Sequence, residues 1–337
     1  MKNKRNGKIV VLKIYQNNIR GFTSKKESLE DILENKVKAD IVLLNETATR
    51  GKTRIKIKND LTFTKNHPYK KSMGGVSTSV ADWLSDSAVR VSDDSEGDEY
   101  LVMRIEKVCP PLNIINMYGQ QEGRDMKVVK EKILESWAKI KKELCLIEMR
   151  GESVLLFGDI NRAVGADELG VRGNKEKISF GGQLLRDLVE TKDYVIFNNL
   201  EMAVGGPWTR EDPADGGLSC LDLCIGSVNL LPFLNSVEVD SQRKVAARRV
   251  KVNRKGETKS TFSDHFPLIV ELKMPTAEVK SENKTRWNVN KPGGWDVYKE
   301  TSNKLANEIE KIVADKDLDK EMMHKKVEKV NDKIKYI

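Results

Sequence analysis

The sequence predicts a mixed α/β domain over about residues 8–274. Short runs rich in Ile and Val recur along this stretch, and polar loops separate them. The strand-like runs are separated too irregularly to form the repeated strand–helix units of a doubly wound sheet. With 337 residues, 39% of them hydrophobic, the chain is long and apolar enough to bury one large core.

The N-terminal half of the domain is predicted to be mainly β-structure. Residues 8–15 are the first expected strand. Ser24 and Glu27 have the spacing of a capping box, which indicates a helix with Leu29 and Ile32 on its apolar side. Further short strands are expected at 41–44, 76–80, 88–91, 100–105 and 112–117.

The C-terminal half begins with the longest predicted helix, residues 127–149, in which apolar residues recur at helical spacing. A strand, a helix and a strand are expected next, at 154–157, 182–192 and 194–197. The remainder to residue 273 is predicted to be all-β, because turn-forming residues occur at 205–217 and 253–256.

The chain beyond the domain differs in composition. Residues 275–294 are polar and lysine-rich at first and are predicted to form a linker. Residues 295–337 show helical periodicity with free apolar faces. We expect a helical extension there that leads toward a further, downstream region.

Composition also limits where the protein works. No apolar run approaches the ~20 residues that span a bilayer, and the N-terminal apolar stretch is too short for a signal peptide. The four cysteines form no CxxC pair. We therefore expect a protein of the nucleus or cytoplasm, not secreted and without a membrane partner.

The net charge of +8 is concentrated in one segment. Residues 241–260 carry eight basic side chains against the single acid Glu257, a net of +7. Such a patch suits a polyanion, although a solvated loop that only aids solubility would look the same.

Polar residues stand where apolar runs begin or end. They are Asn18, Glu46, Tyr118, Asp159, Asn161, Asp222, Asp264 and His265. Strands of a two-sheet sandwich present their ends along common edges, so these residues can meet. Burying Asp222 within its apolar run would cost several kcal/mol unless the carboxylate were paired, and a histidine is the natural partner.

Six motifs give the chain a family resemblance. They are Asn18-Ile19-Arg20-Gly21, Leu44-Asn45-Glu46-Thr47, Asn116-Met117-Tyr118-Gly119, Gly158-Asp159-Ile160-Asn161, Leu221-Asp222-Leu223 and Ser263-Asp264-His265-Phe266-Pro267. In order and spacing they resemble the endonuclease/exonuclease/phosphatase superfamily, and within it the apurinic-type endonuclease domain of non-LTR (LINE-type) retrotransposons. The resemblance covers about residues 8–274. It implies a four-layer α/β sandwich of two packed mixed β-sheets flanked by helices, here with a C-terminal helical extension.

The resemblance also implies a metal site. Glu46 would hold Mg²⁺ with Asn18 beside it, and Asp264 would complete the acidic floor. Carboxylate and amide oxygens suit Mg²⁺, with Mn²⁺ as a substitute.

The same resemblance assigns catalytic roles. His265, braced by Asp222, would contact the scissile phosphate or act as a base. Asp159 and Asn161 would position and deprotonate the attacking water. Tyr118 would stabilise the charge that develops on phosphorus.

Departures from the family pattern refine the expectation. Arg20 stands where repair enzymes of the family carry an acid, which favours the retrotransposon branch over an abasic-site repair endonuclease. Asn45 replaces a more usual Gln, and the segment 119–121 lacks the usual Pro-Asn.

Two segments are predicted to contact DNA. In the retrotransposon enzymes a hairpin enters the minor groove at the place that Trp208, Thr209 and Arg210 occupy here, although an ordinary surface hairpin is an equal alternative. A second, basic hairpin runs directly into Ser263 and is expected to contact the DNA backbone. Its basic residues are Arg248, Arg249, Lys251, Arg254 and Lys255.

The sequence thus predicts a Mg²⁺-dependent endonuclease. It would nick double-stranded DNA, leave a 3′-hydroxyl, and prime target-primed reverse transcription by a downstream reverse transcriptase domain. The same fold could instead serve a phosphomonoesterase or phosphodiesterase of inositol phosphates or lipids. A catalytically dead DNA-binding module is the third hypothesis.

Overall fold

The computed structural model describes residues 8–49, 53, 55–57, 60–66, 74–91, 100–120, 126–166, 177–191, 193–252 and 258–277. The chain divides into two compact units, Met1–Glu278 and Val279–Ile337, and every described residue belongs to the first. The predicted linker from residue 278 onward and the predicted helical extension lie outside the described residues, as do Arg254 and Lys255.

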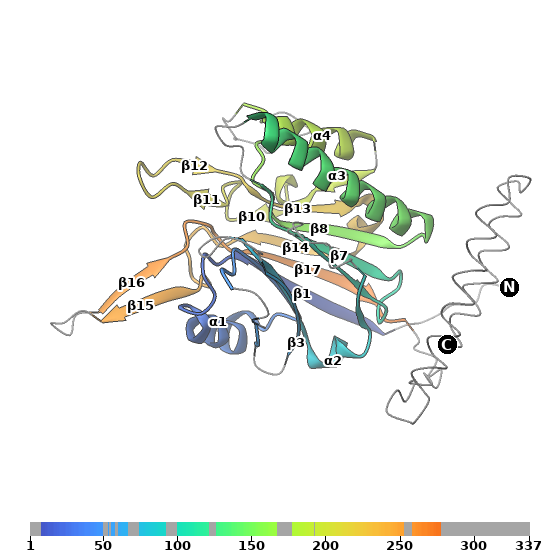
Figure 1. The fold of residues 1–337 in the computed structure, drawn as a ribbon. Coiled ribbons are helices and arrows are strands. Elements are labelled where there is room, and N and C mark those ends of the chain that lie inside the picture. The colour runs from blue at the N-terminus through green and yellow to red at the C-terminus, as the bar shows by residue number, and fades with distance from the viewer. Residues whose placement is uncertain are drawn as a thin grey trace, which may run out of the picture. The chain divides into compact units, whose positions relative to one another are not determined.

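Two mixed β-sheets form the centre of the first unit (Figure 1). The larger has the strand order β10 (Ala203–Val204), β14 (Leu234–Val239), β17 (Leu268–Pro275), β1 (Ile9–Asn18), β2 (Ile41–Asn45), β4 (Val76–Ala81) and β3 (Asp60–Lys65). The smaller has the order β5 (Ala88–Arg90), β6 (Tyr100–Ile105), β7 (Leu112–Met117), β8 (Ser153–Asp159), β13 (Asp222–Ser227) and β9 (Tyr194–Ile196).

The sheets pack face to face over one apolar core. Alternate residues of β1 such as Leu12 and Ile14, together with Leu155 and Phe157 of β8, are completely buried in it. Because side chains of a strand alternate between its two faces, the next inward positions of β1 are Gln16 and Asn18. The hydrophobic interior therefore becomes polar at one edge of the sandwich.

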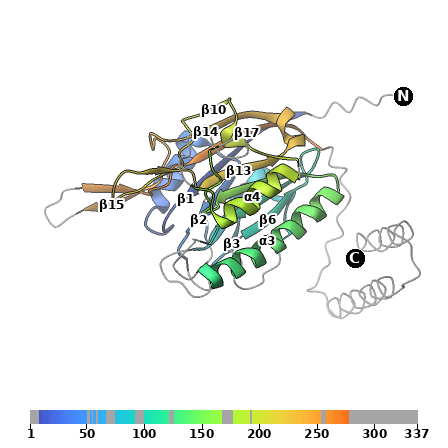
Figure 2. The same cartoon turned by 90° about the horizontal axis from the view of Figure 1, so that it is seen from above.

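Helices cover both outer faces of the sheet pair. Helices α3 (Met126–Met149) and α4 (Phe180–Thr191) lie side by side on the smaller sheet, as Figures 1 and 2 show, and bury Trp137 and Leu185 against it. Helix α1 (Lys26–Ile32) and the π-helical turn η1 (Leu33–Val37) cover the larger sheet. The predicted four-layer α/β sandwich is confirmed.

Two β-ribbons extend from the sandwich on the same side (Figure 1). One pairs β11 (Arg210–Glu211) with β12 (Leu218–Ser219), and the other pairs β15 (Arg248–Val252) with β16 (Thr258–Phe262). Short helical segments complete the unit: α2 (Asp82–Ser85), η2 (Phe197–Asn199) and η3 (Val228–Phe233).

The predicted capping box at Ser24 is wrong. Helix α1 begins at Lys26, and its N-cap residue Lys25 makes no side-chain capping bond. The amide of Lys25 donates to the Phe22 carbonyl, so a turn closes before the helix, and the Ser24 hydroxyl bonds the Gly21 carbonyl instead. Ser24 therefore takes part in a local turn and does not cap the helix.

The sequence analysis also missed strand β3. Only Leu61 and Phe63 are apolar in its six residues, because this strand forms the half-exposed edge of the larger sheet. The apolar pattern in the sequence of β3 is therefore too weak to predict a strand.

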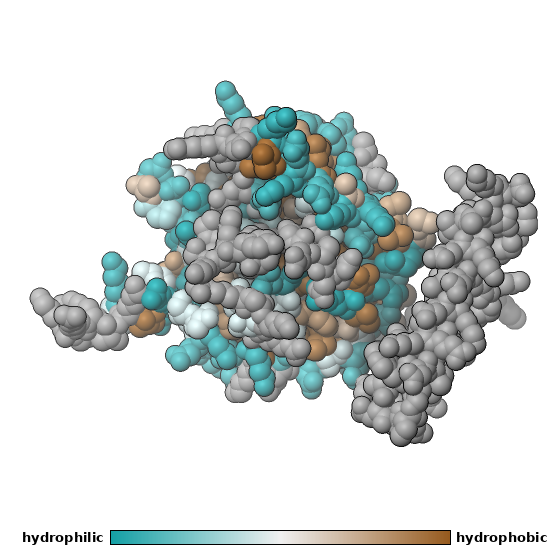
Figure 3. Space-filling view, viewed as in Figure 1, coloured by the Kyte–Doolittle hydropathy of each residue, from teal (hydrophilic) through white to brown (hydrophobic). Residues whose placement is uncertain are grey.

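The surface agrees with a domain that buries its apolar side chains. On the face in Figure 3, hydrophilic side chains predominate among the described residues, and apolar ones form small separate groups. None of the described helices combines the length and apolar character needed to cross a bilayer.

Candidate active site

The polar edge of the sandwich gathers strand ends from both sheets. Strand β1 runs parallel to β2, and β7 runs parallel to β8, so each pair ends at one edge. Strands β13 and β17 run antiparallel to these neighbours and begin at the same edge. This topology unites residues from nearly the whole length of the domain.

A chain of buried amides ties the two sheets together there. Gln16 Nε2 donates to Asn45 Oδ1 at 2.8 Å and to Asp222 Oδ1 at 2.9 Å. Asn45 Nδ2 in turn donates to Asn116 Oδ1 and to the Met117 carbonyl, both at 3.0 Å. All of these side chains belong to fully buried residues, so each bond also satisfies a group that water cannot reach.

A second group of bonds surrounds Glu46, which follows β2. Asn18 Nδ2 donates to Glu46 Oε1 at 3.0 Å and to Asp159 Oδ2 at 2.7 Å. The Tyr118 hydroxyl donates to the same Glu46 oxygen at 2.9 Å. Asn161 orients Asp159, because its backbone N–H donates to Asp159 Oδ1 at 3.2 Å. The side-chain amide of Asn161 donates to the Gly119 carbonyl. The structure therefore brings together five predicted site residues.

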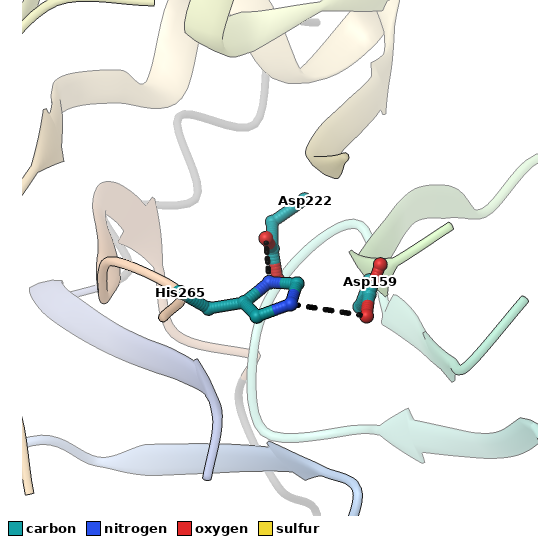
Figure 4. Close-up of side chains that lie close together, drawn as sticks. All are labelled: Asp159, Asp222 and His265. Carbon is teal, nitrogen blue, oxygen red and sulfur yellow. Dashed lines mark hydrogen bonds and ion pairs between the residues drawn. The ribbon is translucent and has the colours of Figure 1, made fainter. Parts of the chain in front are cut away.

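The predicted pair of His265 and Asp222 forms as well. His265 Nδ1 lies 2.7 Å from Asp222 Oδ2, and its Nε2 lies 3.7 Å from Asp159 Oδ2. Figure 4 shows the imidazole ring between the two carboxylates. Burial alone would lower the pKa of His265, but the charges of Asp222, Asp159 and Asp264 outweigh it and raise this pKa to about 9. Burial raises the pKa of Asp159 to about 7, although the nearby His265 opposes the change.

Strained backbone is concentrated at this edge. Arg20, Glu46 and Asn161 have φ angles of 46°, 49° and 52°, a left-handed region that non-glycine residues seldom occupy. Gly158 has φ 137°, and a Cβ atom there would lie 2.0 Å from the Met117 carbonyl oxygen. Only glycine lets the end of β8 approach β7 so closely.

Asp264 lies between two arginines at this edge. Its Oδ1 accepts from Arg20 Nη1 at 2.7 Å, and its Oδ2 accepts from Arg210 Nε at 2.9 Å. These guanidinium groups and His265 outweigh burial and lower the pKa of Asp264. Each carboxylate oxygen of Asp264 therefore already accepts a bond from an arginine.

The three residues of the first ribbon that are predicted to contact DNA differ in how far they are exposed. Thr209 is fully buried, and its hydroxyl accepts bonds from the amides of Leu221 and Asp222, so it offers DNA no surface and instead fixes the start of β13. Trp208 is partly buried and packs against the core between the sheets. Arg210 stays partly exposed beside Asp264.

The basic ribbon keeps its charge at the surface. Arg248 and Arg249 of β15 are exposed, and their strand pairs with β16, which ends at Phe262, one residue before Ser263. The Ser263 hydroxyl donates to the Asn18 carbonyl at 2.6 Å. The ribbon is thus joined directly to the edge that carries Glu46 and His265.

The donor set at Glu46 fits a hard divalent cation. Oε1 of Glu46 accepts both hydrogen bonds, while Oε2 has the Arg20 guanidinium 3.9 Å away. Asn18 supplies an amide oxygen, and the Asp159 carboxylate shares the Asn18 amide with Glu46. Such oxygen donors suit Mg²⁺, which also keeps several waters. Asp159, Asp222 and His265 offer ligand atoms within 4.8 Å of one another, but His265 and Asp222 already satisfy each other.

Comparison with known proteins identifies the architecture. No protein-family model and no curated protein matches the sequence. Solved structures do match. The AP endonuclease LMAP from Leishmania major superposes with a TM-score of 0.61 at 14% identity, covering 79% of this chain and 88% of that one. The chain shares the fold of this AP endonuclease.

Two further solved structures share this fold. The 3′ phosphatase NExo from Neisseria, solved with a product DNA hairpin, has a TM-score of 0.55 at 19% identity, covering 77% of this chain and 99% of that one. The endonuclease domain of TRAS1, a telomere-specific non-LTR retrotransposon, has a TM-score of 0.51 at 14% identity, covering 78% and 98%. The fold predicted from the six motifs is confirmed.

Sequence reasoning missed Gln16. The sequence contained a signal for this residue. The inward-facing positions of β1 are apolar at Leu12 and Ile14 and become polar at the next inward position, which is Gln16. A glutamine on the buried face of a strand needs partners, and here they are Asn45 and Asp222.

Replacing Gln16 with methionine tests the amide chain. The side chains are similar in size, but Gln16→Met leaves Asp222 Oδ1 without this donor. We expect the free energy of unfolding to fall by about 2 kcal/mol, the scale of a hydrogen bond to a buried charge. Urea denaturation measures the change. The control Gln183→Met, at an exposed site on α4, should stay within about 0.5 kcal/mol. Equal stability of the two variants would contradict the role given to Gln16.

Proposed function

We propose that the protein is a Mg²⁺-dependent endonuclease that nicks double-stranded DNA and leaves a 3′-hydroxyl. The observation that carries the proposal is the meeting of Glu46, Asn18, Asp159, Asp222 and His265 at one edge of the sandwich. The matching structures are named as an AP endonuclease, a 3′ phosphatase with product DNA and a retrotransposon endonuclease domain. The activities of these proteins favour a nucleic acid substrate over a small inositol phosphate or a lipid.

Glu46 and Asn18 would hold the cation, which supplies positive charge against the phosphate oxygens when bound. We do not assign Asp264 to this role, because its oxygens hold Arg20 and Arg210. Arg20 places a fixed positive charge 3.9 Å from Glu46 Oε2, which supports a site built for a single divalent ion.

The chain's own residues would then direct hydrolysis. Asp159, oriented by the Asn161 amide, accepts a proton from a water molecule whose oxygen attacks phosphorus. The bond between phosphorus and the 3′-oxygen breaks, and that oxygen takes a proton from solvent to become the 3′-hydroxyl. His265, held by Asp222, donates a hydrogen bond to the phosphate, and the Tyr118 hydroxyl would exchange its bond to Glu46 Oε1 for a second bond to the phosphate.

We further propose that the nick primes reverse transcription of a non-LTR retrotransposon, with the reverse transcriptase in the same polyprotein. The likeness to the TRAS1 endonuclease domain supports this branch. Arg20 supports it too, since its guanidinium pairs with Asp264 where repair enzymes of the family carry an acid.

Supercoiled plasmid tests the activity directly. We expect wild-type protein to convert plasmid to relaxed circles in Mg²⁺ and not in EDTA. Glu46→Gln and His265→Asn should each lower the rate at least about 100-fold, because each removes a group that contacts the reacting phosphate or the cation. A polymerase should extend the nicks without prior phosphatase treatment.

The matched control is Glu238→Gln, which changes an exposed glutamate of β14 and should leave nicking unchanged. Nicking that survives Glu46→Gln or His265→Asn would remove the site assignment. Release of phosphate from inositol phosphates without plasmid nicking would favour the phosphomonoesterase instead.

The exposed basic ribbon is proposed to bind the DNA backbone. Arg248 and Arg249, with the predicted Lys251, lie on one strand of a ribbon that joins the catalytic edge. Arg254 and Lys255 lie outside the described residues and remain predicted contacts. Cations at this place attract phosphate whatever the base sequence.

Neutralising the ribbon should weaken binding to all sequences alike. In EDTA, the double variant Arg248→Gln, Arg249→Gln should bind duplex DNA more weakly and reduce the slope of log affinity against log salt by about 1 to 2. Fluorescence anisotropy measures both. The control Lys8→Gln, Lys273→Gln removes the same amount of charge. Both lysines lie toward the end of the β1–β17 pair that is away from the catalytic edge. If both double variants bind alike, the ribbon is not the DNA contact.

A further inference from the structure

A pocket of about 570 Å³ opens between the two ribbons, beside the candidate active site. Its lining includes Asp212, Pro213 and Gly216 from the turn of the first ribbon, and Thr261 and Phe262 from β16. The volume lies within the roughly 300–1,000 Å³ range of pockets that bind small ligands. A monomeric unit of the DNA substrate is of the right size to enter it.

The charges of the lining favour a neutral occupant. Two arginines and three acids contribute a net of −1, and they are Arg20, Arg243, Glu211, Asp212 and Asp264. Most of these charges already neutralise one another in ion pairs. A phosphate group would therefore find no surplus of positive charge in this pocket.

The remaining lining suits a flat ring with polar edges. Phe262 is 40% exposed although it is a large apolar residue, and it lines the pocket. Glu211 Oε2 accepts from Arg243 Nη1 at 2.8 Å, and the Arg243 guanidinium lies 4.5 Å from the centre of the Phe266 ring. Glu211 is thus held in place while its side chain stays 41% exposed. An aromatic surface beside a fixed carboxylate matches a nucleobase that donates N–H groups.

We propose, on the basis of the endonuclease function above, that this pocket receives one nucleobase swung out of the duplex beside the cleaved phosphate, with guanine preferred. Within a duplex both faces of a base are covered by its neighbours, so the Phe262 ring can stack on a base only after it leaves. Guanine presents two adjacent N–H donors on its pairing edge, and the Glu211 carboxylate accepts them.

The backbone connects this pocket to the catalytic histidine. The Glu211 amide donates to the Asp264 carbonyl at 2.9 Å, and Arg210 forms an isolated β-bridge with His265. A base in the pocket therefore contacts the segment that carries His265. Occupancy orders that segment and raises the rate of cleavage at sites with the preferred base.

The test begins with the nick sites of the wild-type protein, mapped on a plasmid by sequencing the new 3′ ends. Duplex oligonucleotides of one favoured site then carry each of the four bases at each position flanking the nick. In a second series, a mismatch opposite each flanking base reduces the cost of unpairing it. Cleavage rates are compared for wild type, Phe262→Ala, Glu211→Gln and two controls.

The controls are chosen from the same surroundings. Val250→Ala changes another exposed apolar residue of the same ribbon that does not line the pocket, and Glu238→Gln changes an exposed carboxylate on β14. All of these side chains are at least partly exposed, so the variants should fold.

We expect one flanking position at which guanine is cleaved fastest and at which a mismatch raises the rate several-fold. Phe262→Ala should lower cleavage about 5- to 140-fold, the fold-change that corresponds to ~1–3 kcal/mol of base stacking at ~1.4 kcal/mol per tenfold. Glu211→Gln should remove the preference for guanine at that position. Both controls should stay within about twofold of wild type.

Equal effects of mismatches at every position, or a Phe262→Ala variant that cleaves like Val250→Ala, would overturn the pocket proposal and leave the endonuclease function intact. A guanine preference that survives Glu211→Gln would overturn the role of Glu211. Absence of nicking by wild type would overturn the endonuclease function and this proposal with it.

Discussion

Two carboxylates buried side by side constrain the rest of this structure. Asp159 and Asp222 are directly opposite each other on β8 and β13, and neither is exposed to solvent. Isolated charges in such a place would cost several kcal/mol each, so the surrounding groups must compensate them. His265 lies between the two carboxylates, Gln16 donates to one, and Asn18 donates to the other.

The compensation explains the architecture of the edge. Gln16 and Asn18 come from the larger sheet and the two acids from the smaller, so each bond also fixes how the sheets pack. Glycine at position 158 and the left-handed residues Arg20, Glu46 and Asn161 let the chain turn sharply where these groups meet. Strain of this kind persists only where the surrounding structure holds it, and here the hydrogen bonds provide that hold.

The sequence predicted this centre better than its surroundings. The pairing of Asp222 with His265 followed from the cost of burying a carboxylate, and the two-sheet fold followed from the ordered motifs. Thr209 and Asp264 fared differently: each is a short polar residue near the site, and only the fold shows that one fixes a strand and the other holds two arginines. Such roles depend on contacts between distant segments, for which one sequence carries no local pattern. The pocket between the ribbons also depends on contacts between distant segments, since its lining residues extend from Arg20 to Asp264 in the sequence.

The central claim is that this edge, with Glu46 at its rim, is built to hold a divalent cation. Titration with Mn²⁺, followed by the loss of the free-ion electron paramagnetic resonance signal, tests it most directly. Wild type and the surface variant Glu238→Gln should bind Mn²⁺ equally, while Glu46→Gln should bind at least about tenfold more weakly, because it removes a carboxylate ligand. Undiminished Mn²⁺ binding by Glu46→Gln would contradict the account.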